Sequence, residues 1–69
     1  MKVTVNGRPT ELPAGASIRD AALSIGIEPE ARGVAVAVDG EVVPRSLLAR
    51  AELSEGQRVE IVAAIQGGA

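Results

Sequence analysis

Carboxylates are the most numerous side chains with catalytic potential in this 69-residue chain, which has nine Asp and Glu and neither Cys nor His. Paired carboxylates could serve as general acid and base. These acids are spread over predicted turns and outward strand positions, and Asp39-Gly40-Glu41 is far short of a calcium loop, which needs ligands at several positions over about twelve residues. Zinc sites and Ser-His-Asp triads lack their atoms. The sequence therefore predicts neither a metal site nor an enzyme.

The glycine pair Gly67-Gly68 is different, because it follows the last predicted strand, where no turn requires it. A chain without side chains can thread a narrow channel and present its terminal carboxylate to the active site of another protein. Terminal glycines are also typical of frayed chain ends, so the pair alone leaves both interpretations open. Ala69 follows the pair and holds the carboxyl carbon of Gly68 in a peptide bond.

Composition limits the class of protein and its partners. Hydrophobic residues make up 46% of the chain, which is enough for one small core. No aromatic residue is present, so the chain offers no base-stacking platform. The net charge is −2, without a basic run that could neutralise phosphates. No segment resembles a signal peptide or a membrane span. We therefore expect a soluble, cytoplasmic protein that binds neither nucleic acid nor membrane.

The first elements are predicted from residue alternation. Apolar and polar residues alternate over Met1–Val5, which predicts a half-buried strand. Asn6-Gly7 follows directly and is a strong signal for a tight hairpin turn. The second strand is then expected over Arg8–Ala14, at an edge of the sheet, because Pro9 and Pro13 have no N–H to donate to a ladder.

A helix is predicted over Ile18–Ile25, where apolar residues recur at the spacing of one helical face. Ser17 can cap its first amides, and Asp20 favours the positive end of the helix. Gly26 can adopt the left-handed conformation that ends it.

Later segments complete the predicted fold. Strands are expected over Gly33–Val38, Glu41–Val43 and Arg58–Ile65, with one helical turn over Ser46–Arg50. One helix packed across a mixed sheet of four to five strands, with the last strand parallel to the first, is an α+β fold of the β-grasp, ubiquitin-like type.

This arrangement predicts one domain and one tail. The domain covers residues 1–65, and a mobile tail covers residues 66–69, where no large apolar side chain follows Ile65. The centre of the core is expected to hold four aliphatic side chains, those of Val5, Ile25, Val36 and Ile61.

Small apolar residues are predicted on the face of the sheet away from the helix. Ala35 and Ala37 of the third strand should lie beside Val62 and Ala64 of the last, because these strands are neighbours in a β-grasp sheet. Such residues also occur on ordinary surfaces. We interpret this patch as a partner-docking surface because it includes the strand that leads into the tail.

Three segments together resemble the ThiS family of ubiquitin-like sulfur carriers: Val3–Gly7, Gly33–Arg45 and Val59–Gly68. The resemblance spans essentially the whole chain. It implies that the carboxyl of Gly68 is the reacting group, that Gly67 keeps the approach narrow and that Gln66 positions the tail. Ala69 departs from the family pattern, in which the second glycine is the last residue. Three explanations stay open: a peptidase removes Ala69, Ala69 is a cloning remnant, or it marks a relative with another use.

The resemblance also implies partners and cofactors. A ThiF-like enzyme would adenylate Gly68 with ATP and Mg²⁺, and a sulfur donor such as a cysteine desulfurase would then supply the sulfur of a thiocarboxylate. Thiazole synthase, the ThiG-like partner, would accept that sulfur for the thiazole of thiamine. The carrier itself would bind no cofactor and would act as a co-substrate.

Three alternatives remain open at the level of sequence. A carrier of the same chemistry could serve another route, as the MoaD-like subunit does for molybdopterin, or supply cysteine or a secondary metabolite. A ubiquitin-like modifier could be joined to lysines of other proteins, with Lys2 as its only internal acceptor. A β-grasp binding module would not use its terminus at all.

Overall fold

The computed structural model describes residues 1–63, which form a five-stranded sheet and one α-helix. The elements in chain order are β1 (Lys2–Val5), β2 (Arg8–Glu11), α1 (Ile18–Ser24), β3 (Val34–Val38), β4 (Glu41–Val42), the 3₁₀ turn η1 (Arg45–Leu47) and β5 (Arg58–Ala63). Within residues 1–63, no helix has the length and apolar character needed to cross a membrane.

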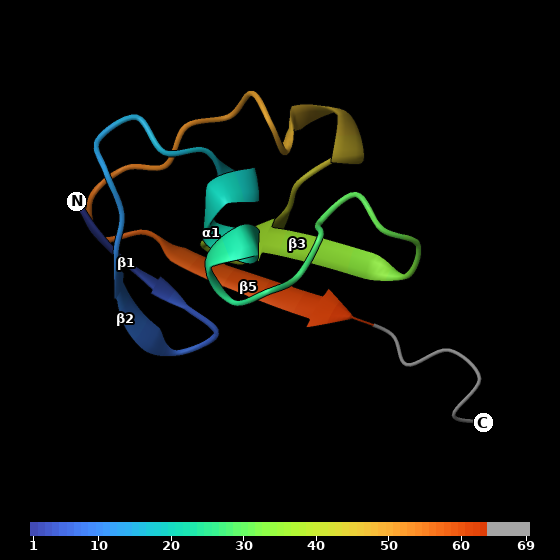
Figure 1. The fold of residues 1–69 in the computed structure, drawn as a ribbon, viewed down its shortest axis with the longest axis horizontal. Helices are drawn as coiled ribbons and strands as arrows, with labels where there is room; N and C mark the ends of the chain where they lie inside the picture. Colours follow the sequence, from blue (N-terminus) through green and yellow to red (C-terminus); the bar gives the residue numbers. More distant parts are fainter. Residues whose placement is uncertain (64–69) are drawn as a thin grey trace.

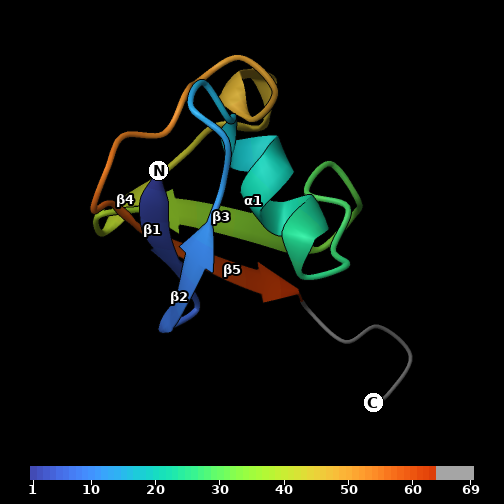
Figure 2. The same cartoon turned by 60° about the vertical axis from the view of Figure 1, so that its left-hand side comes forward.

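The strands lie in the order β2-β1-β5-β3-β4. β1 and β5 run parallel, and the other neighbouring pairs are antiparallel. The helix α1 lies across one face of this sheet, and the opposite face carries no element of the described chain (Figure 1, Figure 2). This is the predicted α+β, β-grasp arrangement, with β5 between the first and third strands as expected.

The hairpin formed by β1 and β2 confirms the predicted turn. Asn6 has φ 51° and Gly7 has φ 82°, both in the left-handed region. The second strand is shorter than expected, since β2 ends at Glu11 rather than Ala14. The last backbone bond runs from the N–H of Leu12 to the carbonyl of Met1 at 2.9 Å, and Pro13 has no N–H with which to continue the ladder.

Helix α1 begins as predicted and ends one residue early. Ser17 and Asp20 form a reciprocal capping box, and Gly26 has φ 78°. Ile25 is the C-cap, with non-helical φ −111° and ψ 16°. Its side chain is 37% exposed, so its predicted place at the centre of the core is wrong, because the helical spacing does not extend to the C-cap. Ile27 packs against the core instead.

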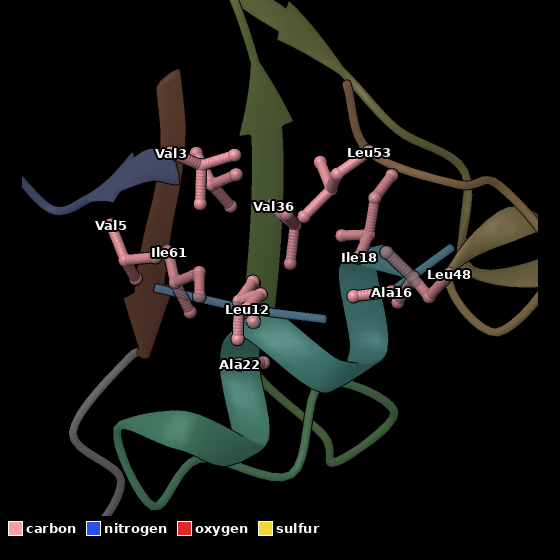
Figure 3. Packing of buried hydrophobic residues seen from close by; sticks show 12 residues of the cluster. Val3, Val5, Leu12, Ala16, Ile18, Ala22, Val36, Leu48, Leu53 and Ile61 are labelled. Carbon is pink, nitrogen blue, oxygen red and sulfur yellow. The ribbon is translucent and has the colours of Figure 1, made fainter. Parts of the chain in front are cut away.

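The core lies between α1 and the sheet (Figure 3). Val5, Val36 and Ile61 are buried as predicted. Leu48 and Leu53 add two buried side chains from the segment between η1 and β5. In β5, the buried Val59 and Ile61 point to the core. Side chains alternate along a strand, so Glu60 and Val62 point to the open face.

The remaining boundaries differ by one to three residues. β3 begins at Val34 rather than Gly33, and β4 ends at Val42 rather than Val43. The helical turn expected over Ser46–Arg50 is η1, which begins at Arg45. β5 is described as far as Ala63, and the last two residues of its predicted range lie outside the described residues. The predicted boundary between domain and tail at residues 65 and 66 also lies outside them.

Candidate functional site

A shallow apolar groove of about 490 Å³ lies on the open face of the sheet. Strand β3 contributes Ala35, Val36 and Ala37 to its lining. The other lining residues are Asn6 from the turn after β1, Val42 from β4, and Glu60 and Val62 from β5. The groove therefore lies mainly over β5, β3 and β4, and β5 is the strand that leads to the C-terminus.

The groove arises from the register of three neighbouring strands. Ala35 lies opposite Val62 of β5, and Ala37 lies between Glu60 of β5 and Val42 of β4. The two alanines reach only one methyl group above the sheet, whereas Val42 and Val62 stand on either side and are 74% and 65% exposed. Small residues on the central strand and larger ones on its neighbours make a surface hollow. Exposed apolar side chains gathered in this way are typical of protein interaction sites.

The structure brings together only part of the predicted docking patch. Ala35, Ala37 and Val62 line the groove, but Ala37 has Glu60 and Val42 as its direct neighbours. Ala64, which was expected beside these alanines, lies outside the described residues. The predicted tail residues Gln66, Gly67 and Gly68 lie outside them as well, as does Ala69.

Four groove residues were not predicted as parts of the site: Asn6, Val36, Val42 and Glu60. Val42 belongs to a two-residue strand whose place beside Ala37 depends on tertiary pairing. Asn6 was interpreted only as a turn residue. Its side chain also reaches β5, where it forms two hydrogen bonds with the backbone of Ile61.

Charged groups contribute little to this surface. Glu60 is the one ionisable side chain among the residues that line the groove. Residues 1–63 contain no buried charged or polar residue and no cluster of His, Cys, Asp or Glu that could hold a metal ion. The described part of the chain thus offers an apolar surface for binding.

An ion-pair network lies away from the groove and includes two half-buried side chains, Arg19 and Glu30. Arg19 donates hydrogen bonds to Glu30 at 3.0 Å and to Glu28 at 3.2 Å. The bond to Glu30, followed by the charge of Glu28, raises the pKa of Arg19 above its ordinary value. Hydrogen bonding with Glu28 and then with Arg19 lowers the pKa of Glu30. This ion-pair network joins α1 to the segment that follows it.

The strand order, the parallel central pair and the single helix across one face define a β-grasp, ubiquitin-like fold. The model of the ThiS family matches residues 3–68. The chain therefore belongs to the ThiS family.

Solved structures with the same fold agree with this assignment. The crystal structure of the thiamine biosynthesis protein ThiS from Geobacter metallireducens is 26% identical, with a TM-score of 0.75 over 99% of this chain and 100% of that chain. A solution structure of a thiamine biosynthesis protein from the same organism is 24% identical, with a TM-score of 0.75 over 100% of this chain and 90% of that chain. No curated protein sequence matches this chain significantly.

Proposed function

We propose that this protein is a sulfur carrier of thiamine biosynthesis and that the carboxyl group of Gly68 carries the sulfur. Membership of the ThiS family supports the carrier role. The observation that carries the proposal for Gly68 is the extent of the family match, which covers residues 3–68 and so includes Gly67 and Gly68 but not Ala69. The thiamine route is favoured over other sulfur-transfer routes because the similar Geobacter metallireducens protein is a thiamine biosynthesis protein.

The chemistry requires activation of a poor electrophile. A carboxylate oxygen of Gly68 attacks the α-phosphorus of ATP, the bond to pyrophosphate breaks, and an acyl-adenylate forms. A persulfide sulfur of the donor then attacks the carbonyl carbon, and AMP leaves with the electron pair of the broken C–O bond, which gives an acyl disulfide. A second thiol acts as the reductant: it attacks the donor's sulfur, forms a new disulfide with the donor and releases the thiocarboxylate of Gly68. The activating enzyme and Mg²⁺ stabilise the negative charge that develops on the phosphates. The carrier contributes the terminus and the surface that docks it.

The tail residues have distinct roles in this proposal. Gly68 reacts, Gly67 allows a narrow approach, and Gln66 positions the tail. A peptidase must first remove Ala69, because the reacting carboxyl otherwise remains an amide. The cysteine desulfurase, the ThiF-like enzyme and thiazole synthase act as the sulfur donor, the activating enzyme and the sulfur acceptor.

The groove supports the docking part of the proposal. Its exposed valines, Val42 and Val62, flank two alanines on a face that no described element covers. Because β5 runs from this groove toward the C-terminus, a partner bound here would hold the carrier close to its reacting end. We propose that the ThiF-like enzyme binds this groove.

Intact-protein mass spectrometry tests the reacting terminus. Chains ending at Gly68 and at Ala69 are incubated with the ThiF-like enzyme, ATP, Mg²⁺ and a sulfur source. We expect the exchange of one oxygen for sulfur in the chain ending at Gly68 and none in the chain ending at Ala69. Equal conversion of both chains, or of neither, would contradict the proposal.

Val62→Arg tests the docking surface. Calorimetric affinity for the ThiF-like enzyme should fall by about tenfold or more, because the substitution places an unpaired charge in an apolar interface. Leu23→Arg is the matched control, since this exposed leucine lies on α1 across the sheet from the groove. Circular dichroism establishes that both variants fold. Unchanged affinity in folded Val62→Arg, or an equal loss in Leu23→Arg, would reject the groove as the docking site.

A further inference from the structure

The hydrogen-bond ladder between β1 and β5 stops where the first hairpin turns. The N–H of Thr4 donates to the carbonyl of Gln57 at 3.0 Å, and the N–H of Asn6 donates to the carbonyl of Val59 at 2.9 Å. Acceptors in a parallel ladder recur every second residue, so the next one is the carbonyl of Ile61. Asn6 and Gly7 have positive φ values, and the backbone therefore turns away into β2 before it reaches Ile61.

The side chain of Asn6 takes the place of the missing backbone. Its Nδ2 donates to the carbonyl of Ile61 at 3.1 Å, and its Oδ1 accepts from the N–H of Ile61 at 2.7 Å. A primary amide offers the same donor and acceptor as a peptide group. Both bonds are partly buried, where an unpaired N–H or carbonyl would be costly. The side chain thus adds one further step to the ladder.

We propose that Asn6 is a positioning residue of the carrier. Asn6 holds the C-terminal half of β5 so that the tail leaves the domain from a fixed point. This inference rests on the proposed function of Gly68. Within residues 1–63, the pairing of β1 with β5 ends at Val59, and the side chain of Asn6 bonds the backbone of Ile61 on the β1 side. Val62, the next residue, lines the docking groove. These two hydrogen bonds, here called the Asn6 clamp, therefore act on β5 beside the docking groove.

The turn between β3 and β4 provides a matched control. Asp39 and Gly40 have φ values of 50° and 85°, nearly those of Asn6 and Gly7. Oδ1 of Asp39 accepts from the N–H of Arg58 at 2.9 Å, at the other end of β5. Replacement of either residue by glycine keeps the turn conformation accessible and removes only the side chain that contacts β5.

Amide hydrogen exchange in the full chain tests the clamp. In Asn6→Gly the N–H of Ile61 loses its acceptor, and we expect its exchange to accelerate by about tenfold or more relative to the N–H of Thr4. The Thr4 amide belongs to the same ladder and reports any general loss of stability. In Asp39→Gly the amide of Arg58 should accelerate in the same way, while that of Ile61 should not. Unchanged relative exchange of Ile61 in Asn6→Gly would overturn the clamp.

Steady-state adenylation tests the positioning role. With the form that ends at Gly68, Asn6→Gly should lower kcat by about tenfold, because a loosened tail affects the reacting geometry. Asn6 also lines the groove, so KM is expected to change as well, but by less than in Val62→Arg. Val62→Arg should raise KM, and Asp39→Gly should change neither value by more than about twofold. Unchanged kcat in Asn6→Gly with accelerated Ile61 exchange would reject the positioning role. No adenylation of the unsubstituted form would reject the proposed function and this role with it, and the Ile61 exchange rates would still decide the clamp.

Discussion

The two tight turns of this protein, Asn6-Gly7 and Asp39-Gly40, have almost the same backbone and different side-chain chemistry. Their first residues have φ values of 51° and 50°, and their glycines 82° and 85°. Each turn lies beside β5, and each first residue uses its side chain to contact the backbone of that strand. The two residues differ only in whether the side-chain terminus is an amide or a carboxylate.

The hydrogen-bonding needs of β5 explain this difference. At Arg58, the backbone N–H of Asp39 already donates to the carbonyl at 2.8 Å, so the side chain needs only to accept. At Ile61, the side chain of Asn6 must both donate and accept. A carboxylate accepts hydrogen bonds but cannot donate, whereas an amide does both. The backbone of a turn therefore permits either residue, and the strand beside it decides which one fits.

The largest expected effect on stability comes from truncating Ile61, the residue whose backbone Asn6 holds. Ile61 is 5% exposed, and Ile61→Ala should lower the free energy of unfolding by about 2 to 5 kcal/mol. Val62→Ala, on the neighbouring exposed residue, should change it by less than about 0.5 kcal/mol. Chemical denaturation measures both values. If the denaturation midpoint of Ile61→Ala equals that of the unsubstituted chain, the assignment of strand faces is wrong.

Isosteric exchange of the two turn residues should lower the stability of the protein by unequal amounts. Asn6→Asp removes the donor to the carbonyl of Ile61 and places an anionic oxygen against it, which should cost about 1 to 3 kcal/mol at pH 7. Asp39→Asn keeps the acceptor for the N–H of Arg58 and should cost less than about 0.5 kcal/mol. Chemical denaturation of both variants provides the comparison. Equal costs would mean that the clamps do not depend on donor capacity.

Acidification sharpens the same comparison. A protonated carboxyl has an O–H that can donate. The cost of Asn6→Asp should therefore be full at neutral pH, shrink as the pH falls through the raised pKa of the folded-state carboxyl, and be smallest below the ordinary Asp value of about 4. The unsubstituted chain serves as the reference at each pH, which removes effects of other titrating groups. A cost that is constant between neutral and acid pH would exclude the repulsion between the two oxygens as its cause.

Much of the fold was predictable because its signals are local. Residue alternation predicts the strands, and Ser17 and Gly26 mark the limits of the helix region. Ile25 was misplaced because helical spacing was extended across a cap, where the backbone has already left the helix. The error arises from one local conformation and leaves the other predicted core residues in place.

The candidate site was predictable only in part because its geometry depends on distant pairings. Asn6 and Ile61 are 55 residues apart in the chain, and no local pattern distinguishes an asparagine that clamps from one that only turns. The position of Val42 beside Ala37 depends on a strand of two residues. The predictions for Ala64 and for the tail lie outside the described residues and stay predictions.

The glycines of the two turns should respond alike. A Cβ on Gly7 or Gly40 would meet nothing within 4 Å, so the cost of Gly7→Ala or Gly40→Ala arises from the backbone conformation alone. We expect each to lower the free energy of unfolding by about 1 kcal/mol, with a difference smaller than about 0.5 kcal/mol. Thermal denaturation would show a clear inequality if the two turn backbones were not equivalent.

The smallest effect is expected where side chains join two elements through charge rather than through an amide. Arg19 of α1 binds Glu28 and Glu30 on the segment after the helix. The pKa of Glu30 is lowered by hydrogen bonding with Glu28 and Arg19. A carboxyl with a lowered pKa in the folded state stabilises the protein above its pKa in the unfolded chain, and this stabilisation is lost as the pH falls through the folded value. The amide of Asn6 does not titrate in this range, so the Arg19 network should depend on pH and the bonds of Asn6 should not.

Arg19→Met should therefore lower the thermal midpoint slightly at pH 7, and the difference from the unsubstituted chain should shrink as the pH falls through the lowered pKa of Glu30 in the folded state and disappear below it. Added salt should reduce the same difference, because exposed ion pairs are screened. Arg50→Met is the control, since Arg50 makes no ion pair within residues 1–63. A difference that persists in acid would mean that Arg19 stabilises the fold through packing of its aliphatic stem, in which case the charge network contributes no measurable stability.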